Sequence, residues 1–199
     1  MRRRTPLLWF GLSLVGIAGL TLIGPAEKSL GANVRVVYLH GVWVWTALAA
    51  FLAAAGTGIV GLALQNDRLQ RWSRALGRTG LFFWISYLPI SMWAMQTNWN
   101  GLYLAEPRWR LAVIFSLGGL ALQIGITLVD SPAWAAGANI AFTLALFLAL
   151  RATEEVMHPA SPIFSSDAWR IQIYFAGLLL LTLLAAWMLA RWAYQLESP

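Results

Sequence analysis

The sequence predicts an all-α integral membrane protein, a single domain over residues 1–199 that forms a bundle of six transmembrane helices. Of the 199 residues, 59% are hydrophobic and only 11% are charged, whereas a soluble domain carries about 25% charged residues. The charged residues cluster between long apolar stretches, as they do in multi-pass membrane proteins. None of these stretches alternates apolar and polar residues, which argues against the strands of a membrane β-barrel.

Six apolar runs are long enough to cross a bilayer as helices, which takes about 17–25 residues. They cover about residues 7–23, 38–64, 79–95, 111–129, 133–150 and 171–190. The first run follows the basic segment RRRTPLLWF, as the apolar part of a secretory signal would. It is longer than such a part, however, and no small-residue cleavage site follows it. We therefore expect it to remain as the first helix.

The placement of arginines predicts the orientation. Three arginines occupy positions 2–4, and Arg68, Arg71, Arg74 and Arg78 lie between the second and third runs. Cytoplasmic loops are enriched in Lys and Arg, and two crossings separate these segments, so both fall on the cytoplasmic side. With six crossings both termini are cytoplasmic. The loops at about 24–37, 96–110 and 151–169 then face outward.

Several classes of function are disfavoured by composition. The chain has no cysteine, which excludes disulfides, iron–sulfur clusters and a cysteine nucleophile. Its net charge of +6 is explained by the positive loops of a membrane protein, so we expect no nucleic acid partner. The glycine-rich segment at residues 56–61 follows no strand, and helix packing explains it better than phosphate binding.

The only two histidines fall on the outer face. His40 lies in RVVYLHGVWVW at the start of the second run, and His158 lies in EEVMHPASP before the last. Imidazole binds iron, zinc or copper, and two imidazoles can fill both axial positions of a haem iron. Interfacial anchoring of each histidine is the alternative explanation.

The outer loop between the histidines, MQTNWNGLYLAEPRWR, supplies side chains suited to a porphyrin. Trp99 and Tyr103 offer aromatic faces, and Arg108, close to Glu106, can pair with a haem carboxylate. Such aromatic residues also form the ordinary interfacial belts of membrane proteins. The loop therefore supports a haem site only together with the two histidines.

These segments resemble the CcmC family of haem-handling membrane proteins in cytochrome c assembly. RVVYLHGVWVW is similar to the family's Tyr-x-His segment with a following Trp, and ATEEVMHPASPIF to its second histidine segment. The family's outer loop reads W-G-x-W-W-x-W-D-x-R. On WNGLYLAEPR, Trp99 takes the first tryptophan, Glu106 the aspartate and Arg108 the arginine, while Leu102, Tyr103 and Ala105 replace the other tryptophans. The resemblance covers about residues 8–190.

The resemblance implies a protein that holds haem at the outer face of a bacterial or archaeal plasma (inner) membrane for cytochrome c biogenesis. His40 and His158 would be the axial ligands of a non-covalent, b-type haem. Trp99, Tyr103, Glu106 and Arg108 would form the remaining platform. The implied partners are a haem chaperone and the subunits of an ABC-type transporter. The chain has no G-x-x-x-x-G-K-[ST] motif, so it would use no ATP itself, and we expect a haem-transfer protein rather than an enzyme.

Two other functions remain open at this point. One is a b-type haem electron-transfer subunit such as a quinol-linked cytochrome, although two histidines offer only one haem. The other is a cofactor-free accessory subunit of a larger membrane complex, which the altered tryptophan loop favours. A transporter is a weaker alternative because no charge pair lies within the apolar runs.

Overall fold

The computed structural model describes residues 5–154, 156, 163–164 and 167–197. Within them it is an all-α bundle of six helices: α1 (Thr5–Ile23), α2 (Val34–Ala63), α3 (Asp67–Trp99), α4 (Pro107–Val129), α5 (Pro132–Ala152) and α6 (Trp169–Leu196). Five of them, all except α3, are long and apolar enough to cross a membrane. The predictions of an all-α fold and of a membrane-spanning protein are confirmed to this extent.

The helix α3 begins earlier than its apolar run predicts. The run starts near residue 79, whereas the helix starts at Asp67 and includes the arginine-rich segment. The side chain of Asn66 caps it by accepting a hydrogen bond from the backbone N–H of Leu69 at 3.1 Å, and such a cap favours helix initiation. Polar residues such as Ser86 and Ser91 dilute the apolar half of α3, which makes it less apolar than its neighbours.

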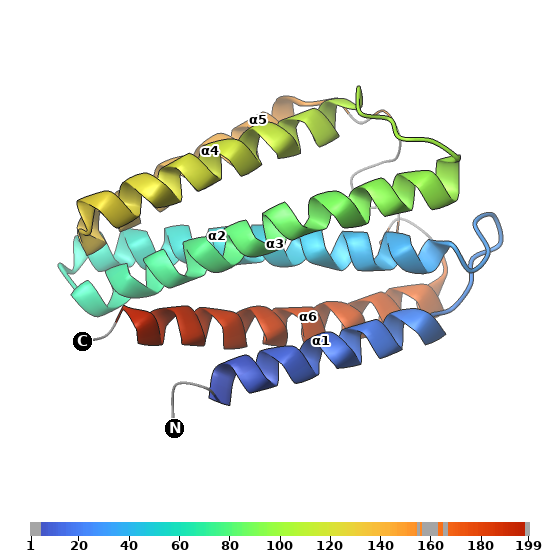
Figure 1. Cartoon of the computed structure of the whole chain (residues 1–199), viewed down its shortest axis with the longest axis horizontal. Helices are drawn as coiled ribbons and strands as arrows, with labels where there is room; N and C mark the ends of the chain where they lie inside the picture. The colour runs from blue at the N-terminus through green and yellow to red at the C-terminus, as the bar shows by residue number, and fades with distance from the viewer. Residues whose placement is uncertain (1–4, 155, 157–162, 165–166, 198–199) are drawn as a thin grey trace.

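The connections between helices are long at one end of the bundle and short at the other. Residues 24–33 and 100–106 lie at the long-loop end, where α5 also ends and α6 begins (Figure 1). The short-turn end holds the connections at 64–66 and 130–131, the beginning of α1 and the end of α6 (Figure 1). Successive helices therefore alternate in direction, and the three long connections share one end.

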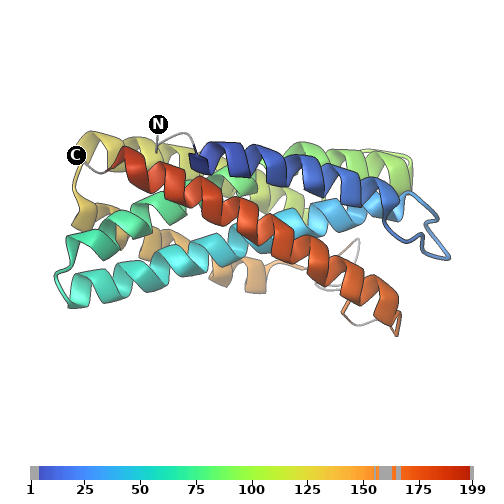
Figure 2. The same ribbon diagram turned by 90° about the horizontal axis from the view of Figure 1, so that it is seen from below.

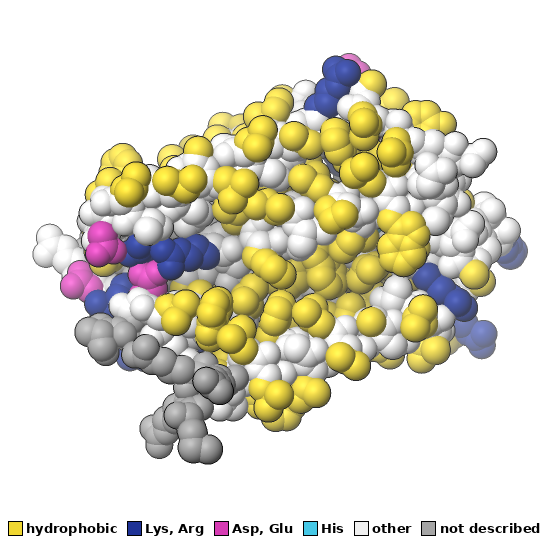
Figure 3. All heavy atoms as spheres, viewed as in Figure 1, with side chains coloured by type: hydrophobic (Ala, Val, Ile, Leu, Met, Phe, Trp, Pro, Cys, Tyr) yellow, Lys and Arg dark blue, Asp and Glu magenta, His cyan; other side chains and the backbone are white. Residues whose placement is uncertain are grey.

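The bundle has three layers, with α2 and α3 in the middle. The pair α4 and α5 covers one side of them, and α6 and α1 cover the other (Figure 1). Seen from below, α6 crosses the bundle obliquely (Figure 2). Both α2 and α3 contact four other helices. On the face drawn in Figure 3, apolar side chains cover the middle and charged ones gather toward the ends, as expected of a membrane-spanning bundle.

An ion-pair network fastens the short-turn end. Nη1 of Arg74 lies 2.8 Å from Oδ1 of Asp130 and 3.0 Å from Oε2 of Glu197, and Arg78 also pairs with Glu197. The side chains of Arg74 and Glu197 are only 6% and 8% exposed. Buried charges need such pairing. The network joins the start of α3 to the α4–α5 turn and to the end of α6.

Glycines let the helices approach closely in the core. Asn139 of α5 is buried, and its Nδ2 donates to the backbone carbonyl of Ser73 at 2.9 Å. The backbone of Gly77 lies against the Asn139 amide, and a Cβ on Gly77 would come within 2.5 Å of Oδ1 of Asn139. Small residues at such contacts are typical of membrane helix interfaces.

Replacing Gly77 by Ala is therefore expected to destabilise the bundle. The added methyl group displaces the Asn139 amide from its bond to Ser73, and overpacking of this kind costs about 1–3 kcal/mol. Unfolding in mixed detergent micelles measures the change. Gly118→Ala is the matched control because a Cβ there meets nothing within 4 Å. Equal stability of the two variants would contradict the packing described.

Candidate ligand-binding site

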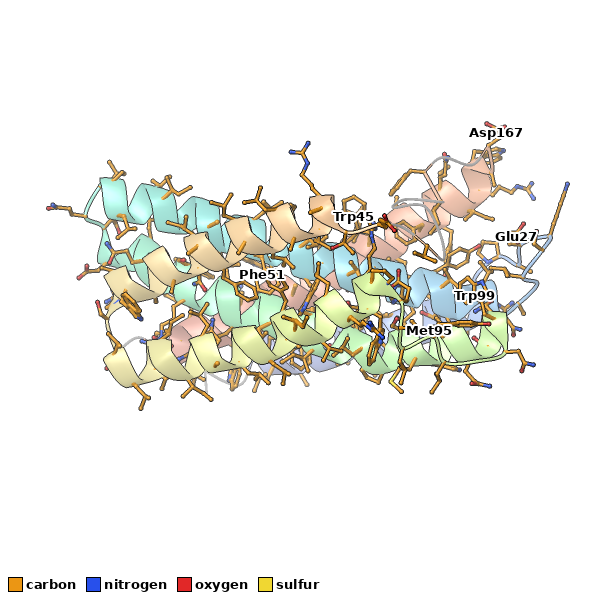
Figure 4. All side chains as sticks on the ribbon, turned by 90° about the horizontal axis from the view of Figure 1, so that it is seen from above. Glu27, Trp45, Phe51, Met95, Trp99 and Asp167 are labelled. Carbon is orange, nitrogen blue, oxygen red and sulfur yellow. The ribbon has the colours of Figure 1, made fainter. Side chains whose placement is uncertain are left out.

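A cavity of about 290 Å³ lies between the helices in the long-loop half of the bundle. Its walls come from α2, α3, the start of α4, the end of α5 and the start of α6. The connections before α2, before α4 and between α5 and α6 also contribute side chains. Figure 4 shows Trp45, Met95 and Trp99 in this half, with Phe51 nearer the middle of the bundle. The residues that line it are Leu30, Val37, His40, Gly41, Val44, Trp45, Trp84, Tyr87, Ser91, Ala94, Met95, Trp99, Glu106, Arg108, Trp109, Leu150, Ile163, Phe164 and Phe175.

His40 lies in the second turn of α2 and faces α3 across the inner part of the cavity. Its ring is half-buried, and its centroid lies 5.6 Å from that of Tyr87 with the two planes 60° apart. The neighbouring Gly41 lets α6 come close, since a Cβ there would lie 3.0 Å from Cε2 of Phe175. The imidazole is thus held among aromatic rings from α3 and α6.

The rim of the cavity is formed where α3 ends and α4 begins. Asn100 ends α3 in the left-handed conformation, with φ at 55°, which Asn tolerates better than most residues. Glu106 then caps α4, because its Oε2 accepts a hydrogen bond from the backbone N–H of Trp109 at 2.5 Å. The cap fixes the first turn of α4, and Arg108 in that turn lines the cavity.

Asparagine contacts hold the rim of α3 against the start of α2. Nδ2 of Asn33 donates to the carbonyl of Thr97 at 3.1 Å, and Nδ2 of Asn98 donates to the carbonyl of Asn33 at 3.4 Å. These bonds fix the register between the two helices that contribute His40 and Trp99.

Four of the six predicted site residues line this one cavity: His40, Trp99, Glu106 and Arg108. Tyr103 is not among the lining residues; it is 48% exposed, and its hydroxyl donates to the carbonyl of Trp99 at 3.3 Å. His158 lies outside the described residues. The structure therefore brings together residues from α2, α3 and α4 that are up to 68 positions apart in sequence.

The sequence prediction missed the contribution of α3 to the inner wall. Trp84, Tyr87, Ser91 and Met95 all line the cavity. They recur at intervals of three or four residues, which places them on one helix face. That spacing is visible in the sequence, but within an apolar run it is also the ordinary pattern of residues packed against another helix.

The chemistry of the site combines one imidazole with a guanidinium at the rim and aromatic walls. Within the described part of the chain, no three His, Cys, Asp or Glu side chains gather to hold a bare metal ion. Haem needs fewer protein ligands, because the porphyrin supplies four of the iron's six positions. An imidazole for iron, Arg108 for a carboxylate and aromatic faces for the ring form a donor set that fits haem.

No protein-family model, no curated protein and no solved structure matches this chain. What the cavity binds is therefore inferred from its own residues.

Glu106→Ala is expected to lower the free energy of unfolding by about 1 kcal/mol, because it removes the cap of α4. Glu106→Asp keeps a carboxylate at the cap and is expected to retain most of the stability, although Asp is shorter. Thermal unfolding of the purified variants measures the difference. If alanine and aspartate at this position were equally stable, Glu106 would not stabilise the start of α4.

Proposed function

We propose that the chain is a haem-binding membrane protein of cytochrome c biogenesis, a divergent relative of the CcmC family. The observation that carries the proposal is the shared cavity. His40 opens into the same space as Trp99, Glu106 and Arg108, which are the residues that the resemblance assigns to the haem platform. Interfacial anchoring alone gives no reason for these side chains to converge on one cavity.

Each described residue has a distinct part in holding the ligand. His40 would hold the iron of a bound haem through its imidazole, and His158 would supply a second imidazole. Arg108 at the rim pairs with a carboxylate of the ligand, and Glu106 keeps Arg108 there by fixing the first turn of α4. Trp99 and Trp84 provide aromatic faces, whereas Tyr103 is exposed and does not line the cavity. Haem, when bound, would supply an iron that imidazole nitrogens can bind.

The proposal includes the orientation in the membrane. All six helices cross the bilayer, α3 with its apolar half, so that the long-loop end faces the periplasmic or extracellular side and both termini are cytoplasmic. The alternating helix directions support this, as does the position of Arg68, Arg71, Arg74 and Arg78 toward the short-turn end. The membrane would be the plasma (inner) membrane of a bacterium or archaeon.

The haem would be passed on rather than used for chemistry. Its position at the outer end suits delivery to a membrane-anchored haem chaperone, and an ABC-type transporter complex would supply any ATP hydrolysis. The chain itself would then act as a haem-transfer protein without enzymatic activity.

The orientation can be tested with single cysteines because the chain has none of its own. Ser29 and Leu64 are both exposed, at opposite ends of the bundle. In intact cells stripped of any outer membrane, a membrane-impermeant maleimide is expected to label Ser29→Cys and not Leu64→Cys. After permeabilisation both should react. The reverse pattern would invert the proposed orientation.

Haem binding can be tested on the purified chain with added haemin. We expect a low-spin, bis-imidazole absorption spectrum, and we expect His40→Ala or His158→Ala to weaken haem binding by about tenfold or more. Even partners behind the direct ligands of a metal contribute 10–100-fold. Trp187→Phe, which changes an exposed aromatic residue outside the cavity, serves as the control. Normal haem content and spectrum in the double histidine variant would refute the proposal.

A further inference from the structure

Two residues of α3, Tyr87 and Ser91, bring hydroxyl groups to the wall of the cavity. Tyr87 is 6% exposed and Ser91 is 7% exposed, and both line the cavity. Neither hydroxyl has a hydrogen-bond partner within the part of the chain that the structure describes. Folded proteins usually give such polar groups a hydrogen-bond partner, so both hydroxyls are available to a molecule bound in the cavity.

Ser91 differs in this respect from the serines and threonines around it. On the same helix, Ser86 donates to the carbonyl of Phe82 at 2.7 Å and Thr79 to that of Ala75 at 2.9 Å. Such bonds to the carbonyl four residues earlier are the usual way in which a helix satisfies a hydroxyl. Ser91 makes no such bond to the carbonyl of Tyr87, and its hydroxyl is therefore available to the cavity.

Tyr87 and Ser91 both line the inner part of the cavity. Residues 87 and 91 are one helical turn apart, on the same face of α3. The charged lining residues, Glu106 and Arg108, lie at the rim where α4 begins. The nearest aromatic neighbour is Trp84, whose ring centroid is 5.1 Å from that of Tyr87. Two uncharged donors in aromatic surroundings match an uncharged oxygen acceptor on an apolar ring.

We propose that the inner part of this cavity binds the carbonyl-bearing ring of a lipid-soluble quinone, with Tyr87 and Ser91 as hydrogen-bond donors. This goes beyond haem binding, because the edge of haem b opposite its carboxylates carries only hydrocarbon groups and would leave both hydroxyls unpaired. The cavity measures about 290 Å³, close to the lower end of the roughly 300–1,000 Å³ typical of ligand pockets. A single-ring headgroup fits such a volume.

The apolar tail of a quinone would leave the cavity beside Trp45 and Phe164. Trp45 and Phe164 line the cavity and are also 43% and 49% exposed. Their rings pack edge to face at 6.4 Å, and Phe164 in turn packs against Phe175 of α6 at 5.6 Å. The wall here is thus aromatic, and its two outer residues are exposed on the side of the bundle.

The test is binding of decylubiquinone to the purified, haem-free full chain. Binding is measured by the quenching of tryptophan fluorescence. Tyr87→Phe and Ser91→Ala each remove one hydroxyl and leave the packing nearly unchanged. Each is expected to weaken binding about two- to tenfold, the amount that one hydrogen bond contributes. The double variant should bind more weakly than either single variant.

Matched controls separate the two hydroxyls from general effects. Tyr174→Phe and Ser116→Ala remove hydroxyls that donate to Leu20 and Ala112 outside the cavity, and they should bind decylubiquinone as the unchanged chain does. Decylbenzene, which has the tail and a ring but no carbonyl, should not distinguish the variants. If Tyr87→Phe and Ser91→Ala bind decylubiquinone like the controls, the hydroxyls hold only water and the proposal is overturned.

The outcome does not depend on haem. Quinone binding is measured in haem-free protein. The chain can therefore bind quinone without binding haemin, or bind haemin without binding quinone, and the two proposals are tested separately. If both ligands bind, they are expected to compete, because they share one cavity. Simultaneous binding at full stoichiometry would place the quinone elsewhere and overturn the assignment.

Discussion

The close antiparallel packing of α2 against α3 is the contact on which the cavity depends. Two glycines allow this packing. A Cβ added to Gly61 would lie 2.9 Å from the backbone nitrogen of Gln70, and a Cβ added to Gly80 would lie 2.7 Å from Cδ1 of Phe51. Because both helices are continuous, this contact also sets where their other ends meet. At that end His40 of α2 faces Tyr87 of α3. The position of this ring pair beside the cavity therefore depends on the helix packing at the other end of the bundle.

Some polar groups between the helices are satisfied by a neighbouring helix. Nε1 of Trp43 donates to Oγ of Ser86 at 2.9 Å, and Oγ1 of Thr143 donates to the carbonyl of Phe51 at 3.2 Å. In the hydrocarbon no water is at hand to replace such partners, so a polar group left unpaired is costly there. The hydroxyls of Tyr87 and Ser91 have no such bond to another described residue, and both residues line the cavity.

Apolar runs could predict the helices, and the alternation of crossings could predict which ends share a side, because both follow from the thickness of a bilayer. Hence His40, Trp99, Glu106 and Arg108 were expected near one another, and they do share a cavity. The early start of α3 could not be predicted from the apolar run. The charge of Arg74 can be buried only because it pairs with Asp130 and Glu197, which are distant in sequence. The position of Tyr87 and Ser91 in the cavity wall could not be predicted for a similar reason. The face of α3 that lines the cavity is known only once the neighbouring helices are in place.

The two ends of the bundle differ in structure: one is joined by buried ion pairs, and the other contains the cavity. At the short-turn end, Arg74 and Glu197 are buried together and join three segments of the chain, so the helices cannot separate there without exposing an unpaired charge. At the other end the connections are long, and the charges of Glu106 and Arg108 stand at the rim of a cavity instead of closing the core. A ligand that enters between α2, α3 and α6 would meet the aromatic side chains and the hydroxyls that line the cavity. Fixing one end of the helices in this way allows the opposite end to accept a molecule while the fold is kept.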